Sequence, residues 1–438
     1  MTKEHEEEGL DRLYEFLMEE EDARVCKDIP EGACTSVPGN FFKITASQTL
    51  TKLADELANA KTVLPWLISA LGAPAFWIGF LVPVRESGSL VPQLAIAAAI
   101  RDRPIRKYVW LLGAVLQAGA LAGMALTGFF LRGGVAGAAV VGFLALFSLA
   151  RGLASVSSKD VKGKTIPKTR RGRLTGLTTA VAGILTILTG AALTWLVPED
   201  PSAELTASII LGGAVLWILA ALVFSTVQEE PGATEGARHG LKEALESLSL
   251  LRTDKPFRRF VTVRALLIST ALAGPYYVTL ARESGGGRES SLSVFILASG
   301  LASALSSFFW GRYSDRSSRK VLMAAAGAAS FLGLLVFVLN ALGVVGAVGW
   351  IAPLGFFLLS MSHGGVRIGR KTYLLDMASG NRRTDYVAVS NTIIGVALLL
   401  SSTLGFLAPL IGPGGMLLIL SLMGFAGVWG GKHLPEVQ

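Results

Sequence analysis

The chain has 438 residues, of which 51% are hydrophobic and only 16% are charged. About a quarter of the residues of a soluble globular protein are charged. This composition, with a mean hydropathy of +0.54, therefore excludes an ordinary soluble protein and predicts that lipid surrounds most of the chain. The formal net charge of +8 is explained below by the connections between apolar segments, and nucleic-acid binding is a poor explanation of it.

Residues 1–61 are predicted to form an acidic cytosolic leader. They hold 14 acidic residues against 7 basic ones, and they lack the basic start and apolar core of a cleaved signal peptide. Leucines recur at helical spacing within 10–17 and within 50–57, which predicts two amphipathic helices, the second along the inner membrane surface. Cys26 and Cys34 are interpreted as ordinary thiols, because cytosolic cysteines are normally reduced. A solvated leader that helps to set topology is favoured over a regulatory or partner-binding domain.

Twelve apolar segments follow, and each is read as a helix crossing a hydrocarbon core about 30 Å thick, which takes roughly 20 residues. The predicted spans are 62–84, 87–101, 107–131, 134–154, 174–197, 206–227, 258–281, 290–311, 320–341, 344–364, 386–409 and 413–431. The second is short, since the stretch from Ser87 to Ile100 gives only about 21 Å of helix at 1.5 Å per residue. Arg85 and Glu86 are therefore expected low in the outer leaflet or on a span that starts earlier.

Basic residues are concentrated in alternate connections between these spans. The segments 101–107, 151–173, 312–320 and 367–383 together hold 21 Lys and Arg, whereas the opposite connections hold four. Positively charged loops stay in the cytoplasm, so the sequence predicts that these four segments and both termini are cytosolic.

The longest central connection, 228–257, is predicted to be a cytosolic linker between two halves. It contains Pro231 and Gly232, and its leucines share one helical face. It separates a predicted six-helix bundle at 62–227 from a second at 258–438.

The halves share sequence patterns. The segment 102–107 (Asp-Arg-Pro-Ile-Arg-Lys) returns 213 residues later as 315–320 (Asp-Arg-Ser-Ser-Arg-Lys). Leu-Ile-Ser, a proline with two nearby aromatic residues, and Arg-Glu-Ser-Gly follow one another in 67–88 and again in 267–285. A repeat that spans half of a hydrophobic chain is typical of duplicated membrane transporters, and the second pattern is interpreted as the first span of each half.

Twelve spans in two halves, with Gly-x-x-x-Asp-Arg-x-x-Arg-Lys between the second and third spans of a half, resemble the major facilitator superfamily. The matching residues in the second half are Gly311, Asp315, Arg316, Arg319 and Lys320, with Ser318 where glycine is usual. The first copy has Ala98 and Ile105 at the glycine positions. The resemblance covers roughly residues 62–432 and implies an all-α membrane protein with 12 transmembrane helices in two pseudo-symmetric six-helix bundles.

The resemblance also implies a cytosolic gate. Asp102 is expected to meet the start of the eleventh span near Arg382 and Arg383, and Asp315 the start of the fifth, because a carboxylate can accept hydrogen bonds from a helix amino terminus and pair with arginine. The expected gate residues are Asp102, Arg103, Arg106, Lys107, Arg171, Asp315, Arg316, Arg319, Lys320 and Arg383. The plainer alternative is that these bases only set the topology.

Candidate binding and coupling residues come from the repeated pattern and from charges near the spans. They are Phe76, Trp77, Arg85, Glu86, Tyr276, Tyr277, Arg282, Glu283 and His363. Prolines beside the aromatic pairs are expected to break each first span near mid-depth, where transporters bind substrates, and the charged pairs are expected to flank the outer mouth symmetrically. An aromatic belt or plain packing, rim ion pairs, and bases that reach the inner interface are the corresponding alternatives.

The sequence has no ATP-binding Gly-x-x-x-x-Gly-Lys-Ser/Thr loop, no metal-ligand cluster and no catalytic triad spacing, so no enzyme and no cofactor are predicted. The leading hypothesis is a monomeric secondary transporter in a bacterial cytoplasmic membrane, embedded in lipid, that moves a small organic solute by alternating access. Arg151, Arg264 and Arg367 favour an anionic or amphiphilic substrate if they line the cavity. Proton coupling is a hypothesis resting on Glu86, Glu283 or His363.

The alternative from another class is a non-transporting membrane assembly or sensing protein that docks through its leader, since a fold does not fix a function. Deletion of residues 2–45 is expected to separate the two, because a carrier would keep its transport and a docking protein would lose its partner. The solute and the direction of transport are not readable from the sequence.

Overall fold

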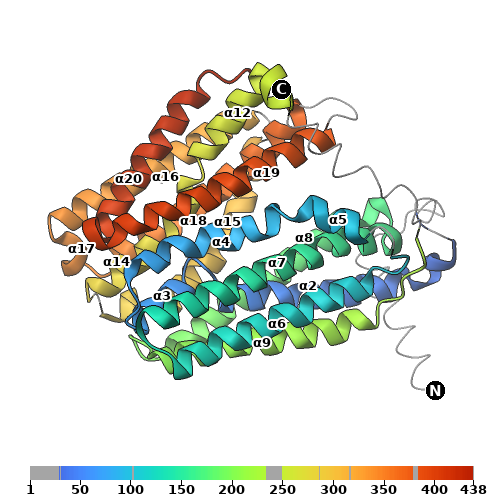
Figure 1. Ribbon diagram of the computed structural model, residues 1–438, viewed down its shortest axis with the longest axis horizontal. Coiled ribbons are helices and arrows are strands. Elements are labelled where there is room, and N and C mark those ends of the chain that lie inside the picture. Colours follow the sequence, from blue (N-terminus) through green and yellow to red (C-terminus); the bar gives the residue numbers. More distant parts are fainter. Residues whose placement is uncertain are drawn as a thin grey trace.

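The computed structural model describes residue 29 and residues 31–100, 103–232, 249–285, 287–314, 317–377 and 383–437, and the elements in this part of the chain are helices (Figure 1). The first half comprises η1 (Glu31–Ser36), α2 (Val37–Leu57), α3 (Val63–Ala70), η2 (Ala75–Trp77), α4 (Ile78–Leu90), α5 (Gln93–Ile100), α6 (Lys107–Phe130), α7 (Gly133–Thr165), α8 (Lys168–Leu196) and α9 (Ala203–Ser225). The second comprises α11 (Leu250–Thr253), α12 (Lys255–Leu266), α13 (Ser269–Leu272), α14 (Gly274–Glu283), η4 (Gly287–Ser290), α15 (Leu292–Ser314), α16 (Ser318–Ala341), α17 (Val344–Ala347), α18 (Ile351–Met377), α19 (Arg383–Ser401), η6 (Ser402–Leu407) and α20 (Ala408–Gly431).

Several helices begin at side chains that satisfy their free amino-terminal N–H groups. The Asp254 carboxylate accepts from the Phe257 N–H at 2.9 Å before α12, and Ser202 accepts from Leu205 at 3.2 Å before α9. Such caps typically contribute about 1 kcal/mol each. They fix where the long apolar helices start, and hence which residues reach the middle of the bundle.

The first predicted span is wrong in its bounds. Residues 62–84 contain a turn after Ala70, and the helix that precedes this turn starts at Val37. Helix α2 packs inside the first half, where Ser47 donates to the Ala220 carbonyl at 3.0 Å and Asn40 exchanges two hydrogen bonds with Gln228 at 2.8 and 2.9 Å. Hydropathy misses α2 because it carries charged and polar side chains that face the protein instead of lipid.

The predicted leader 1–61 therefore includes a helix of the bundle, and a deletion of residues 2–45 would remove part of α2. Deleting 2–28 spares that helix. Residues 1–28 and the linker segment 233–248 lie outside the described residues. Cys34 is disulfide-bonded, so the prediction of an ordinary thiol there is wrong; Cys26 lies outside the described residues.

The two halves lie side by side, and their ribbons are nearest at the end where α3 and α14 lie and diverge toward the end where α5 and α12 lie (Figure 1). We call these the Arg282 end and the Arg106 end, after one residue at each. At the Arg282 end, η2 and α4 meet η6, where the Phe76 and Phe406 rings stack with centroids 5.5 Å apart. A Cβ on Gly79 would overlap the Cα of Gly405, so glycine at both positions permits this close approach.

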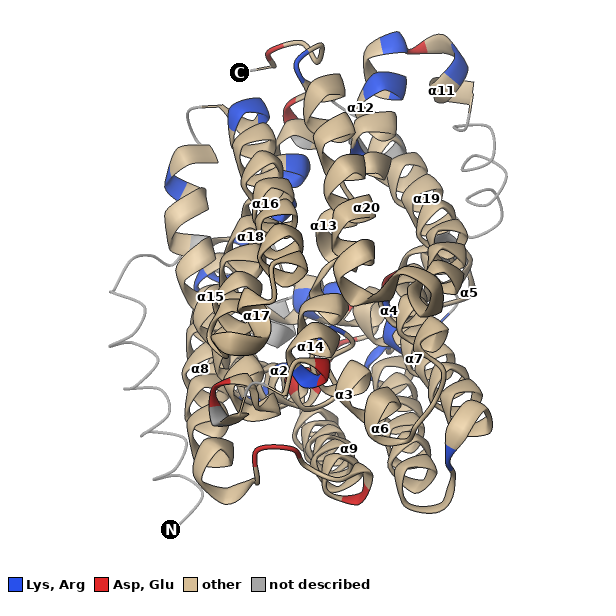
Figure 2. Ribbon diagram, turned by 90° about the vertical axis from the view of Figure 1, so that its left-hand side faces the viewer, with Lys and Arg blue, Asp and Glu red and all other residues tan. Residues whose placement is uncertain are grey.

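The described helices include nine stretches long and apolar enough to cross a membrane. Their outer faces carry exposed large apolar side chains, such as Leu126, Phe130 and Leu222, as expected of lipid-facing helices. Charged residues lie at the two ends and in the interior between the halves (Figure 2). The total of twelve spans stays a prediction.

Candidate functional site

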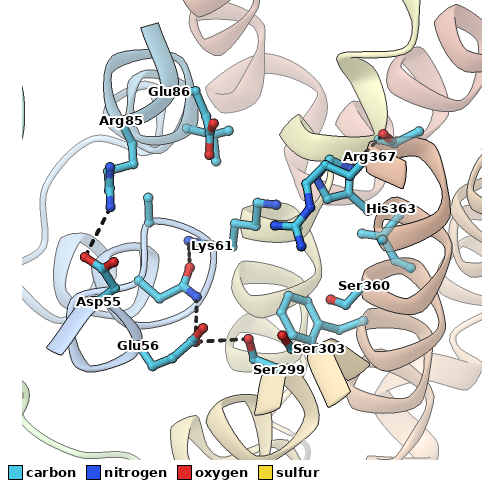
Figure 3. A pocket seen from close by; sticks show the side chains of 18 of the residues that line it. Asp55, Glu56, Lys61, Arg85, Glu86, Ser299, Ser303, Ser360, His363 and Arg367 are labelled. Carbon is cyan, nitrogen blue, oxygen red and sulfur yellow. Dashed lines mark hydrogen bonds and ion pairs between the residues drawn. The ribbon is translucent and has the colours of Figure 1, made fainter. Parts of the chain in front are cut away.

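A cavity of about 340 Å³ lies between the halves (Figure 3). Its walls come from α2, α4 and α7 of the first half and from α13, α14, α15 and α18 of the second. Its charged lining residues are Asp55, Glu56, Lys61, Arg85, Glu86, Arg151 and Arg367. Small-molecule sites have volumes of about 300–1,000 Å³, so the cavity suits a small solute.

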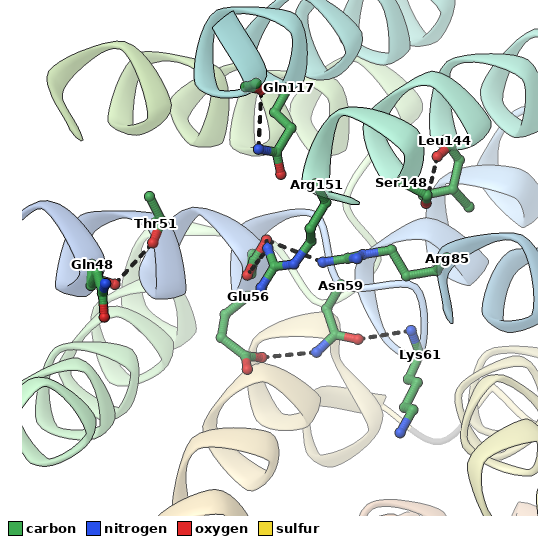
Figure 4. A network of polar contacts seen from close by, with 12 residues as sticks. Gln48, Thr51, Glu56, Asn59, Lys61, Arg85, Gln117, Leu144, Ser148 and Arg151 are labelled. Atoms are coloured by element: carbon green, nitrogen blue, oxygen red, sulfur yellow. Dashed lines mark hydrogen bonds and ion pairs between the residues drawn. The ribbon is translucent and has the colours of Figure 1, made fainter. Parts of the chain in front are cut away.

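Three charged side chains on three helices form one cluster at the first-half wall, and Figure 4 shows two of them, Arg85 and Arg151, side by side. Arg85 on α4 places Nη2 3.3 Å from Oδ1 of Asp55 on α2, and Arg151 on α7 forms an ion pair with the same carboxylate. The Arg85 guanidinium also lies 4.8 Å from the centroid of the Phe147 ring. The single carboxylate therefore holds α4 and α7 against α2 and neutralises part of the charge of the two arginines.

The neighbouring Glu56 makes contacts of a different kind. Its Oε2 accepts hydrogen bonds from the Asn59 amide at 2.9 Å and from the Ser299 hydroxyl at 3.1 Å. Ser299 lies on α15, so the second bond joins the two halves. The described residues include no cation in an ion pair with Glu56, and its carboxylate is held by neutral donors.

Lys61 extends from the turn after α2 into the cavity. Its backbone N–H donates to Oδ1 of Asn59 at 2.8 Å, and its methylene stem passes the start of α14, where a Cβ on Gly274 would lie only 3.2 Å from the Lys61 Cβ. Glycine at this position gives the lysine room beside the second half. The ammonium acts electrostatically on Glu86 and on Glu56.

The second-half wall is basic. A smaller cavity of about 90 Å³ shares Lys61, Glu86, His363 and Arg367 with the larger one. Its remaining charged lining residues are Arg264 and Arg370. Taken together, the two cavities have six Lys and Arg side chains and three carboxylates. This excess of positive charge favours a solute with an anionic group.

Two of these basic side chains are held by hydroxyl or amide groups. Arg264, on α12, donates to the Ser390 hydroxyl at 2.6 Å and to Oδ1 of Asn391 at 2.9 Å, both on α19. Nδ1 of His363 lies 3.0 Å from the hydroxyl oxygen of Thr270. The contacts of Arg264 involve no carboxylate, so its guanidinium adds positive potential to this wall.

The sequence-predicted candidates separate into three groups. Arg85, Glu86 and His363 line the cavity, so the expected position of Arg85 and Glu86 at the outer mouth is wrong, and the structure has the other expectation, a helix that starts earlier. The reason is that α4 starts at Ile78 and carries both residues well inside the bundle. Whether the three bind or couple stays a prediction.

The aromatic candidates form the second group, and they pack beside the site without lining the larger cavity. The Phe76 and Trp77 rings are in contact with centroids 4.6 Å apart and planes tilted by 34°, at the Arg282 end. Tyr277 is fully buried, and Tyr276 is 4% exposed. Their positions favour a packing role.

Arg282 and Glu283 form the third group and lie at the last turn of α14, at the Arg282 end. Arg282 Nε donates to Asp200 at 3.1 Å and Nη1 to the Trp66 carbonyl at 3.3 Å, and its guanidinium lies 5.4 Å from the centroid of the Trp66 ring. Asp200 and Trp66 belong to the first half, so Arg282 links the halves. The expected symmetry with Arg85 and Glu86 is wrong, because those two residues lie within α4 and line the cavity, whereas Arg282 and Glu283 lie in the last turn of α14.

The charged turns are described only in part. Asp102, Asp315 and Arg316, and the side chain of Arg383, lie outside the described residues. The Arg103 N–H donates to the Ile100 carbonyl at 3.1 Å, and Arg171 donates to the carbonyls of Ile166 and Gly163. The gate therefore stays a prediction.

The other described gate residues bond within their own half. Arg106 pairs with Asp160 at 2.5 Å, and Glu229 accepts from the backbone N–H groups of Arg106 and Lys107. In the second half, Arg319 pairs with Glu436 at 2.9 Å, and Ser317 donates to Glu436 and caps Lys320. In each half, a carboxylate that follows the last helix thus lies at the start of another helix, Glu229 at α6 and Glu436 at α16.

Sequence reasoning missed Asp55, Glu56 and Lys61, which it placed in the leader. One signal was available: the apolar run that starts at Thr62 reaches Gly72 and Pro74 after about ten residues, roughly half the length that a span needs. A helix that includes this run must therefore take residues from upstream, where the three charges lie.

The family model of the Major Facilitator Superfamily matches residues 56–402. The chain belongs to this superfamily. No curated protein matches the chain. Among solved structures, a D-xylose–proton symporter is similar with a TM-score of 0.69 and 15% identity, covering 91% of this chain and 98% of its own. The nucleoside transporter NupG has a TM-score of 0.67 and 14% identity, covering 90% and 98%. A POT family transporter in complex with 5-aminolevulinic acid has a TM-score of 0.65 and 13% identity, covering 92% and 98%.

At these identities the solved structures show the fold alone. With the superfamily, they make this chain a multi-pass membrane protein of the transporter class and not an enzyme.

Proposed function

We propose that this protein is a secondary active transporter that carries a small organic solute with an anionic group through the cavity between its halves. The observation that carries the proposal is the charged space formed jointly by both halves, with basic side chains in excess over carboxylates. Ionisable groups at membrane depth are costly and mark substrate pathways. The site lies at the interface between repeats, where alternating access exposes a fixed site to each side in turn.

The arrangement of the halves supports an inward-facing state. The Arg282 end is held by Arg282 on Asp200 and Trp66 and by the Phe76 and Phe406 rings. The ribbons diverge toward the Arg106 end (Figure 1), which carries most of the bases and faces the cytosol by the positive-inside rule. We place the protein in a bacterial cytoplasmic membrane as a monomer, with both termini cytosolic.

We further propose that transport is proton-coupled. Glu86 and His363 line the cavity, whereas Glu283 lies at the Arg282 end, which leaves the first two as coupling candidates. Glu86 is surrounded by Lys61, Arg85, Arg367 and Arg370. A proton gained by its carboxylate would free these bases for a solute anion, and this competition links proton movement to substrate movement.

The test is uptake into proteoliposomes under an imposed pH gradient, with small organic acids, amino acids, sugars and nucleosides as solutes. We expect an anionic solute to accumulate, and Arg367→Gln to reduce its uptake at least tenfold. Arg312→Gln, which removes an arginine outside the cavity, is the matched control and is expected to transport normally. Equal uptake by the Arg367 and Arg312 variants would contradict the proposed site. If Glu86→Gln and His363→Asn both keep uptake driven by the pH gradient, the hypothesis of proton coupling through these residues is refuted.

A further inference from the structure

The charges around the cavity are unevenly distributed. Asp55 and Glu56 are adjacent on α2, while His363 and Arg367 lie on α18 across the space. Figure 3 shows Glu56 and Arg367 on opposite sides of the cavity, with Lys61 between them. The first-half wall carries all the lining carboxylates of the cavity, beside Lys61, Arg85 and Arg151, and we call it the acidic wall. The second-half wall carries Arg367 and His363 and we call it the basic wall, so a solute that fits the space meets both.

On the acidic wall, only Glu56 is available to a ligand. Asp55 is already paired with Arg85 and Arg151, whereas Glu56 accepts only from the neutral Asn59 and Ser299 among the described residues. A carboxylate inside a protein without a partner cation is strongly destabilising. A cationic group on the solute would supply that partner, with Ser299 beside it as a further polar contact.

On the basic wall, Arg367 is the side chain best placed for an anion. It lines both cavities, it is exposed to them, and no carboxylate forms an ion pair with it among the described residues. A guanidinium binds a carboxylate through two parallel hydrogen bonds. Lys61 and His363 lie on the same lining, so an anionic group has several donors within one region.

We propose that the solute is a small zwitterion of the amino-acid type, with its ammonium group at Glu56 and its carboxylate at Arg367. This inference rests on the proposed transport function and narrows its substrate class. The bound zwitterion adds no net charge to the cavity, and each of its ends meets a side chain that has no ion-pair partner among the described residues. Because Glu56 also bonds to Ser299 of the other half, an ammonium group at this position would contact both halves and be sensitive to their separation.

A plain anion site makes a different prediction. If a proton, and not an ammonium group, neutralises Glu56, the solute needs only its carboxylate. N-acetylated derivatives would then bind as tightly as the parent amino acids, and the same molecules would distinguish the two cases in the unmodified protein.

The test is binding to the purified full-length protein in detergent, first by thermal stabilisation with the twenty standard amino acids and simple dipeptides, and then by calorimetry for the strongest ligand. Its N-acetyl derivative keeps the carboxylate, and its amide keeps the ammonium group. We expect either change to weaken binding at least tenfold. We expect Glu56→Gln to bind the parent ligand only as tightly as the unmodified protein binds the N-acetyl form. We expect Arg367→Gln to bind the parent ligand only as tightly as the unmodified protein binds the amide.

Matched controls are Glu283→Gln and Arg312→Gln, which remove like charges outside the cavity and are expected to leave the affinities unchanged. The proposal is overturned if no zwitterion binds, or if the N-acetyl form binds the unmodified protein as tightly as its parent. If only monoanions bind tightly and are taken up, the zwitterion proposal is refuted and the proposed transport function stands. Absence of uptake for every solute class would instead count against the transport function.

Discussion

The tetrapeptide Arg-Glu-Ser-Gly occurs twice, and its two copies do different things. At 85–88 it lies inside α4, where Arg85 and Glu86 line the cavity and Ser87 is fully buried. At 282–285 it ends α14, where Gly285 takes a φ of +64° and leaves the helix. The two identical tetrapeptides therefore have different roles, because each lies on a different helix and contacts different partners.

The largest difference in stability is expected between variants of Asp55 and Asp200, the carboxylates that pair with Arg85 and Arg282. Asp55 is 16% exposed beside Arg85, whereas Asp200 is 66% exposed beside Arg282. Asp55→Asn leaves Arg85 and Arg151 without a carboxylate, and removing one partner of a buried pair costs about 3–5 kcal/mol. Asp200→Asn is expected to cost about 0.2–1 kcal/mol, as for exposed pairs. Thermal unfolding in detergent measures both, and equal losses would show that the burial difference does not matter.

The two glutamates give the second contrast. Glu86→Gln removes the carboxylate from among four bases in the cavity and is expected to change solute uptake at least tenfold. Glu283→Gln is expected to change it less than twofold, because Glu283 lies outside that lining. Uptake into proteoliposomes is the measurement. A larger change in uptake for Glu283→Gln than for Glu86→Gln would contradict the assignment of the site to the tetrapeptide at 85–88.

The contact at the Arg282 end is expected to be sensitive to side-chain volume. Gly79→Val places atoms where Gly405 now lies, so η2 and α4 must move away from η6 and the closed arrangement of this end is disfavoured. Distances between spin labels at positions 132 and 342, with Cys26 and Cys34 replaced by Ser, should shift to longer values. An unchanged distribution would mean that this close approach does not control closure, and Gly134→Val, at a glycine with open space around it, is the control.

The smallest effect is expected from Arg282→Gln. The Arg282–Asp200 pair is partly exposed, and such pairs contribute about 0.2–1 kcal/mol. The same spin-label distances should therefore show a shift of only about two- to fivefold in the ratio of closed to open states. A complete loss of the closed state would identify Arg282 as the dominant latch and reverse the expected order of the two substitutions.

The sequence by itself determined the membrane class, the superfamily and the all-helical fold. Apolar helices carry their signal locally, since a run such as Lys107–Phe130 is recognisable from length and hydropathy alone. It also identified Arg85, Glu86 and His363 as residues worth locating. These conclusions depend on composition and spacing, which need no knowledge of what packs against what.

Only the tertiary structure decided where the charges meet. Asp55 and Glu56 lie on α2, and Lys61 lies in the turn that follows it. Helix α2 is too polar for a hydropathy criterion, and its packing on α8 and α9 places it in the bundle. Likewise, Ser299 and Arg367 reach the same cavity from helices more than 200 residues further along the chain. Helix ends and cavity walls are set by contacts between distant segments, and such contacts cannot be predicted from local sequence patterns.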